Sequence, residues 1–150
     1  MNRIRDWLYI GNYRDTLAPA LIQQQGIGAV LHLIYGIQLP AEIATLCLAV
    51  PDGEPLPFDK LAQGVAFVRA QKAQGRTVMV ACAAGVSRSV SFSMAVLHEE
   101  EQLSLLDAFK AIFAEHPHAM PHPALVASLS RYYNDPIKIS EVWDVIQKVQ

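Results

Sequence analysis

The chain has few cysteines, no excess of charge of one sign and no long apolar run. Two cysteines in 150 residues are too few for a disulfide scaffold, so each is a core residue or a chemical group. Twelve Lys and Arg against fourteen Asp and Glu give a net charge of −2, which argues against a nucleic-acid or anionic-membrane surface. No stretch reaches the ~18 apolar residues of a membrane span, and the N-terminus lacks a signal-peptide core. We therefore expect a cytoplasmic protein with neither membrane nor nucleic acid as its partner.

The rest of the composition is that of a folded domain. Hydrophobic residues make up 52% of the chain and charged residues 17%, and a chain of this length buries roughly 70% of its unfolded surface without disulfides or metals. Nine prolines and eight glycines are spread between apolar segments and are not gathered in a linker. We predict one domain over residues 1–135, followed by a tail helix within residues 136–150.

Segments with strand and helix patterns alternate along the chain. The runs at 29–34 and 43–50 are almost continuously apolar, a pattern typical of strands that are covered on both faces. This alternation predicts an α/β class with a mainly parallel sheet. The predicted strands are 7–10, 29–34, 43–50 and 77–81, and the predicted helices are 18–25, 59–74, one that begins at 87–89, 104–115, 123–133 and one that begins at 140.

The loop that follows the strand at 77–81 contains the residues expected to carry chemistry. Cys82 closes the strand and a helix begins about six residues later, so backbone N–H groups converge at a helix N-terminus and form an anion site. The planar guanidinium of Arg88 suits two oxygens of a phosphate. The same field favours the thiolate form of Cys82, which makes this residue a candidate nucleophile. The predicted phosphate-binding residues are Ala83, Ala84, Gly85, Val86, Ser87 and Arg88.

This loop and its flanking segments resemble the dual-specificity phosphatases of the cysteine-dependent protein tyrosine phosphatase superfamily. Residues 82–89 meet the family signature Cys-x-x-Gly-x-Ser-Arg-Ser. Residues 8–31 look like the opening strand, helix and second strand of the family, and residues 103–129 contain its two closing helices. The resemblance covers about residues 4–134. It implies a central five-stranded mixed, mainly parallel sheet flanked by helices, with the nucleophile strand near the centre.

The resemblance also implies a mechanism. The thiolate of Cys82 attacks phosphorus to give a cysteinyl-phosphate, Asp52 protonates the leaving oxygen, and the Ser89 hydroxyl bonds to the sulfur. Asp59 is the alternative acid, although a helix cap suits it better. No metal or cofactor is implied. The expected substrate is a phosphorylated protein or a small phosphate ester, with phosphotyrosine and also phosphoserine or phosphothreonine as targets.

Two positions depart from the family pattern. Ala81 stands where the family usually has a His that orders the loop, and His32 stands where it tends to have an Asn. These departures predict a less activated thiolate, and they leave a catalytically weak phosphate-binding pseudophosphatase as the alternative. The small, uncharged residues of the loop argue against inositol phosphates, which would need additional cations.

Other conspicuous residues have simpler structural interpretations. Cys47 is expected to pack in the core. The acidic run at 99–101 is expected to be the solvated end of a helix, and Trp7 and Trp143 to anchor packing. Three histidines are interpreted as part of a polar loop and not as a metal site, since no acidic or thiol partner is near them: His116, His118 and His122.

Overall fold

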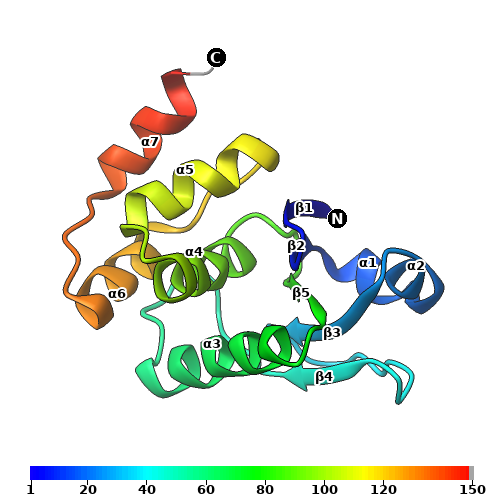
Figure 1. Cartoon of the computed structure of the whole chain (residues 1–150). Coiled ribbons are helices and arrows are strands. Elements are labelled where there is room, and N and C mark those ends of the chain that lie inside the picture. The colour runs from blue at the N-terminus through cyan, green and yellow to red at the C-terminus, as the bar shows by residue number, and fades with distance from the viewer. Residues whose placement is uncertain (149–150) are drawn as a thin grey trace.

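A five-stranded sheet with the strand order β1-β2-β5-β3-β4 forms the centre of the structure, a computed structural model that describes residues 1–148 (Figure 1). β1 pairs with β2 in an antiparallel hairpin, and every other pairing is parallel. The predicted mixed, mainly parallel sheet is confirmed, with β5 at its centre. The strands are β1 (Asn2–Arg5), β2 (Leu8–Gly11), β3 (Ile27–His32), β4 (Ala44–Cys47) and β5 (Thr77–Ala81).

Helices cover both faces of the sheet. Side chains of successive strand residues point to opposite faces, and here both faces are apolar and need to be covered. Leu31 and Val80 pack into the main core beneath α3 to α7. Their neighbours Val30 and Met79 pack on the other face with Ile22 of α2. The helices are α1 (Tyr13–Thr16), α2 (Pro19–Gln24), α3 (Phe58–Ala73), α4 (Arg88–Glu101), α5 (Leu105–Glu115), α6 (Pro123–Tyr133) and α7 (Ile139–Lys148).

The expectation that the run at 43–50 is covered on both faces is wrong. β4 is an edge strand that pairs only with β3. Leu46 packs against the main core, whereas Thr45 and Cys47 are exposed. The prediction that Cys47 is a core residue is therefore also wrong, because at this edge only one face of the strand has a helix over it.

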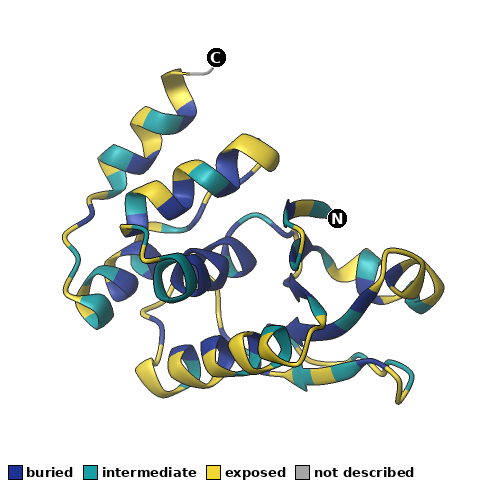
Figure 2. Ribbon diagram, in the orientation of Figure 1, coloured by how far each residue is buried: buried dark blue, intermediate teal, exposed yellow. Residues whose placement is uncertain are grey.

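Helix α4 is the most deeply buried helix of the structure (Figure 2). Its residues from Ser89 to Leu97 are all buried, because α3, α5 and α6 surround it. Ser91, one turn into the helix, donates a side-chain hydrogen bond of 2.9 Å to the carbonyl oxygen of Ser87. The N-terminus of α4 is therefore held firmly under the loop at residues 82–87.

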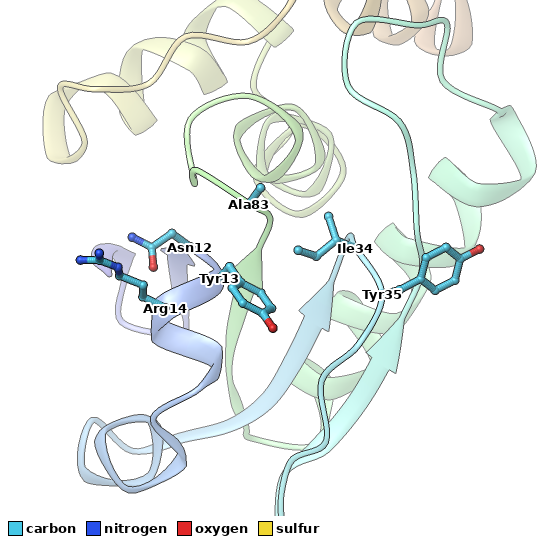
Figure 3. A pocket seen from close by; sticks show the side chains of 6 residues that line it. All are labelled: Asn12, Tyr13, Arg14, Ile34, Tyr35 and Ala83. Atoms are coloured by element: carbon cyan, nitrogen blue, oxygen red, sulfur yellow. The ribbon is translucent and has the colours of Figure 1, made fainter.

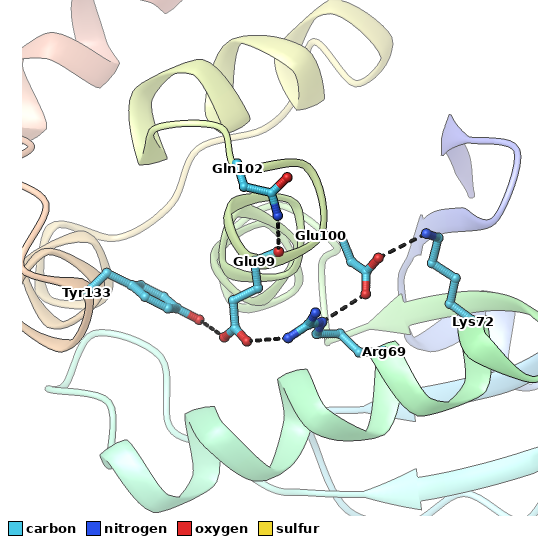
Figure 4. Close-up of polar contacts among 6 residues, drawn as sticks. All are labelled: Arg69, Lys72, Glu99, Glu100, Gln102 and Tyr133. Atoms are coloured by element: carbon cyan, nitrogen blue, oxygen red, sulfur yellow. Dashed lines mark hydrogen bonds and ion pairs between the residues drawn. The ribbon is translucent and has the colours of Figure 1, made fainter.

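The other end of α4 is held by a network of charged and polar side chains (Figure 4). Glu99 accepts hydrogen bonds from Arg69 of α3 and from the hydroxyl of Tyr133 in α6, and Glu100 accepts from Arg69 and Lys72. Hydrogen bonds from these two cations lower the pKa of Glu100, while burial and then the bond to Glu99 raise the pKa of Tyr133. The acidic run therefore connects α4 to α3 and α6. The expectation of a solvated helix end is wrong.

Helix α7 lies beside α5 (Figure 1). Val142 and Ile146 are buried in the main core. Trp143, by contrast, is 46% exposed, so its expected role as a packing anchor is wrong. The expected tail helix is present from residue 139, and positions 149–150 of that prediction lie outside the described residues. None of the helices within residues 1–148 has the length and apolar character needed to cross a bilayer.

Candidate active site

The loop between β5 and α4, residues 82–87, forms a tight turn that we call the cradle. Gly85 has φ +76°, a conformation that favours glycine. A Cβ atom at this position would lie 2.9 Å from the carbonyl oxygen of Gly11. Gly85 is therefore required both by the backbone conformation and by the close approach of the β2 end. The turn leaves Ala83 and Ala84 exposed.

The sulfur of Cys82 lies at the base of the cradle, with the side chain only 2% exposed. Its Sγ is 3.2 Å from Ser89 Oγ and accepts a hydrogen bond of 3.4 Å from the Ser89 backbone N–H. In the thiolate form the Ser89 hydroxyl also donates to the sulfur. The first turn of α4 thus brings the backbone N–H and the hydroxyl of Ser89 to this sulfur, next to the N-terminal end of the helix dipole.

Asp52 lies next to the cradle although thirty residues separate it from Cys82 in the sequence. The Ser87 hydroxyl donates a hydrogen bond of 2.7 Å to Asp52 Oδ1 and accepts one of 3.0 Å from the backbone N–H of His122. Asp52 is exposed to solvent and Ser87 is buried. The structure therefore brings a carboxylate to the edge of the anion site, where it is held by a residue of the cradle itself.

The segment that contains Asp52, residues 51–57, is called the acid loop below. Leu56 is buried, and its backbone N–H donates a hydrogen bond of 2.9 Å to Ser128 Oγ in α6. Asp59, the alternative acid, lies in the first turn of α3. The N-cap residue of α3 is Pro57 and no side chain among the described residues caps the helix, so the expected capping role of Asp59 is wrong, and its carboxylate interacts only with the helix dipole.

Arg88 is the first residue of α4, and its side chain extends towards the start of the acid loop. Its Nη1 donates a hydrogen bond of 3.1 Å to the carbonyl oxygen of Val50. A guanidinium has five N–H donors, so this bond orients the group and leaves further donors. Arg88 and Lys60 line a hollow of about 370 Å³ beside the cradle.

His116 is a residue of the site that the sequence did not reveal. It is 6% exposed, and its Nε2 lies 2.8 Å from the carbonyl oxygen of Gly85. Burial lowers the pKa of His116, so the ring is neutral near neutral pH. Because a carbonyl only accepts, Nε2 carries the proton and donates it to the cradle. The polar-loop interpretation holds for the exposed His118 but is wrong for His116.

His32 is buried behind the cradle, directly beside Ala81 in the register of β3 and β5. Its two ring nitrogens have no hydrogen-bond partner among the described residues. Burial, and to a smaller extent the charge of Arg88, lowers the pKa of His32. The ring lies 6.2 Å from that of Tyr13. A neutral imidazole thus stands one strand away from the position where the family usually has its histidine.

A hollow of about 700 Å³ opens on the Ala83 side of the cradle (Figure 3). The backbone N–H of Tyr13 donates a hydrogen bond of 3.0 Å to the carbonyl oxygen of Ala83. This bond connects Tyr13, which lines the hollow, to the cradle. The other lining residues are Asn12, Arg14, Ile34 and Tyr35. Within residues 1–148, no three His, Cys, Asp or Glu side chains are grouped so that they could hold a metal ion.

Comparison with known proteins agrees with this geometry. The family model described as "Dual specificity phosphatase, catalytic domain" matches residues 8–135. The chain belongs to the dual specificity phosphatase family, as its cradle sequence predicted, and the family's fold is the one observed.

Individual relatives are similar over most of this chain. Dual specificity protein phosphatase 16 of Homo sapiens is 32% identical over 136 residues, which are 87% of this chain and 20% of that protein. Dual specificity protein phosphatase 22-B of Danio rerio is 25% identical over 146 residues, which are 95% of this chain and 79% of the relative. This chain therefore spans a fifth of the first relative and about four fifths of the second.

Two solved structures have the same fold. Human DUSP28 superimposes with a TM-score of 0.82 at 27% identity, covering 89% of this chain and 96% of that chain. A putative dual specificity phosphatase from mouse superimposes with a TM-score of 0.81 at 28% identity, covering 89% of this chain and 86% of that chain.

Proposed function

We propose that this chain is a cysteine-dependent protein phosphatase that hydrolyses phosphotyrosine, and also phosphoserine and phosphothreonine, through a cysteinyl-phosphate intermediate. The observation that carries the proposal is the position of the Cys82 sulfur. It lies at the N-terminus of α4, 3.2 Å from the Ser89 hydroxyl oxygen and 3.4 Å from the Ser89 backbone N–H, inside a loop with the family signature. The mouse relative was solved as a complex with zinc tungstate, and tungstate is a tetrahedral oxyanion like phosphate.

In the first step, the substrate phosphate binds to the backbone N–H groups of the cradle and to Arg88. The Cys82 thiolate attacks phosphorus in line, so the S–P bond forms as the bond from phosphorus to the ester oxygen breaks. Asp52, at the cradle edge, gives its proton to the departing oxygen, which leaves as an alcohol.

In the second step, a water molecule replaces the alcohol. The Asp52 carboxylate takes a proton from this water molecule. The water oxygen attacks phosphorus at the same time, and the S–P bond breaks. The electron pair of that bond returns to Cys82, where the hydroxyl and backbone N–H of Ser89 stabilise the thiolate. Inorganic phosphate is released, and the enzyme returns to its starting protonation state.

A phosphate-binding pseudophosphatase is not favoured. Such a protein needs the cradle and Arg88 but has no use for a sulfur with two donors or a carboxylate at the cradle edge. Two contacts support their proposed roles: Ser89 lies against the Cys82 sulfur, and the Ser87 hydroxyl donates a hydrogen bond to Asp52.

The test is turnover of p-nitrophenyl phosphate in the presence of a reducing agent and a chelator. We expect the unaltered protein to hydrolyse this ester, because a side chain is proposed for every chemical step. We expect no hydrolysis by Cys82→Ser, which lacks the proposed nucleophile. Cys47→Ser is the matched control, since Cys47 is exposed on an edge strand, and it should retain activity. Turnover by Cys82→Ser would exclude the proposal.

We also infer a cytoplasmic location and a phosphorylated protein as partner. Both cysteines are free, and a thiol nucleophile has to remain reduced between turnovers. Glutathione and thioredoxin maintain that state in the cytoplasm.

A further inference from the structure

A third hollow, of about 300 Å³, lies against the end of the cradle formed by Val86 and Ser87. Asp52, Val86 and Ser87 form its wall towards the catalytic sulfur, and Met120 and Trp143 line its outer part. The hollow is thus continuous with the cradle and with the acid loop. One of its walls belongs to α7, which lies beyond residue 135, where the match to the family ends.

The two outer side chains are exposed although both are large and apolar. Met120 is 54% exposed and Trp143 is 46% exposed. The backbone N–H of Met120 donates a hydrogen bond of 2.8 Å to the carbonyl oxygen of Val86, and Trp143 is flanked on α7 by the buried Val142. Both side chains therefore project from an anchored backbone, which fixes where they start at the outer part of the hollow.

The proposed chemistry defines the direction in which a bound substrate extends out of the cradle. In-line attack places the ester oxygen on the side of phosphorus away from Cys82, within reach of the Asp52 carboxyl group. The rest of the substrate continues from that oxygen past Asp52. Since Asp52 also lines the hollow, the part of a peptide next to the phosphorylated residue passes over it.

The chemistry of the lining selects the occupant. The lining contains no Lys or Arg, so it has no cation for a second phosphate. Met and Trp instead provide a polarisable, apolar surface. Resting on the proposed function, we propose that this hollow is a specificity subsite that binds an apolar side chain flanking the phosphorylated residue of a peptide substrate, with Trp143 as its main contact.

The experiment compares phosphotyrosine peptides whose flanking residues are all Ala with peptides that have one Leu, moved through the three positions on each side. The unaltered protein should favour Leu at positions on one side only, by about five- to tenfold in kcat/KM, which corresponds to partial burial of a Leu side chain. Trp143→Ala should bring this ratio close to one, and Trp143→Phe should restore part of it. Tyr35→Ala, which removes an aromatic ring from the hollow on the Ala83 side of the cradle, is the matched control and should keep the Leu preference.

A binding measurement tests the hollow without turnover. The chain contains two tryptophans, so in the double variant Trp7→Phe, Cys82→Ser only Trp143 emits when the excitation wavelength is too long for tyrosine to absorb. The favoured Leu peptide should shift this emission to shorter wavelength more than the all-Ala peptide does, because the Leu side chain removes water from the indole.

The outcomes separate the two proposals. A Leu preference that persists in Trp143→Ala, or no Leu preference in a protein that hydrolyses p-nitrophenyl phosphate, overturns the subsite and leaves the proposed function standing. Absence of p-nitrophenyl phosphate turnover contradicts the proposed function, and the emission of Trp143 then decides whether the hollow still binds the peptide.

Discussion

The hydroxyl group of Ser87 donates a hydrogen bond of 2.7 Å to Asp52 Oδ1 and so joins the cradle to the acid loop. The same oxygen accepts a hydrogen bond from the backbone N–H of His122 at the start of α6. Ser87 is therefore a positioning residue, because it places the carboxylate that we propose as general acid at the edge of the anion site.

The first prediction concerns this pair and the leaving group. Asp52→Asn should lower kcat on an alkyl phosphate by about 10²–10³, since an alkoxide leaves only when protonated, and by much less on p-nitrophenyl phosphate. Ser87→Ala should show the same selective loss at a smaller size, because the carboxylate is present but no longer held. Asp59→Asn is the control and should affect neither ester. Equal losses on both esters would assign Asp52 a structural role, and a selective loss in Asp59→Asn would transfer the acid to that residue.

The second prediction concerns Arg88. Arg88→Lys should weaken inhibition by inorganic phosphate and lower kcat/KM, each by roughly 10- to 100-fold, because an ammonium is a point charge that cannot span two phosphoryl oxygens. Arg14→Lys, at the rim of the neighbouring hollow, serves as control. Inhibition by phosphate that is unchanged in Arg88→Lys would remove this residue from the anion site.

The third prediction separates backbone strain from contact at Gly85. Gly85→Ala combines a positive φ, which costs about 1–2 kcal/mol for a residue with a Cβ, with the 2.9 Å approach to the Gly11 carbonyl oxygen. Gly26 has a similar φ of +77° with nothing within 4 Å of an added Cβ. Gly26→Ala should therefore lower the free energy of unfolding only by the backbone strain energy. Urea unfolding should show a larger loss of stability for Gly85→Ala, together with loss of turnover. Equal losses would mean that the cradle moves freely away from β2.

The fourth prediction concerns pH and His116. Burial lowers the pKa of His116 in the folded protein, and that of His32 likewise, so below about pH 6.5 the unfolded chain binds more protons than the folded one. The free energy of unfolding should therefore fall as the pH drops from 6.5 and stay level above it, as far as these groups are concerned. Carboxylates such as Glu100, whose pKa is also lowered, act only at still lower pH.

Urea titrations of His116→Gln at pH 7.5, 6.5 and 5.5 check this prediction. Glutamine retains a donor for the Gly85 carbonyl but does not titrate, so the loss of stability between pH 6.5 and 5.5 should be smaller than in the unaltered protein. His118→Gln, at an exposed neighbouring position, should behave as the unaltered protein does. The same loss in His116→Gln would show that His116 binds protons equally in the folded and unfolded states, which would contradict the lowered pKa in the folded protein.

Local features could be predicted from the sequence because they depend on consecutive residues. Cys82 at a strand end, Gly85 at the turn and Arg88 at a helix start lie within seven positions of each other, so their order along the chain already predicts a nucleophile inside an anion site. The capping of α5 by Ser104, which accepts from the Asp107 backbone N–H, is likewise a short-range pattern. Family membership followed from the cradle residues together with the flanking segments at 8–31 and 103–129.

Relations between distant segments could not be predicted from side-chain patterns, which do not say which segments become neighbours, and only the family resemblance placed Asp52 near Cys82. The bond from His116 to Gly85 joins residues 31 positions apart, and that from Ser87 to Asp52 joins residues 35 apart. β1 escaped prediction because only Ile4 of its four residues is buried, and it is a strand mainly because it pairs with β2.

The sequence by itself therefore determined the class of the fold and the family, and it predicts Cys82 as the nucleophile and the cradle as the anion site. Only the tertiary structure decided that Cys47 is exposed, that His116 supports the cradle and that Trp143 borders the acid loop. Exposure and contact depend on which elements pack on a given face, and an apolar residue such as Trp143 has the same sequence signal whether a neighbouring helix covers it or leaves it open to a ligand.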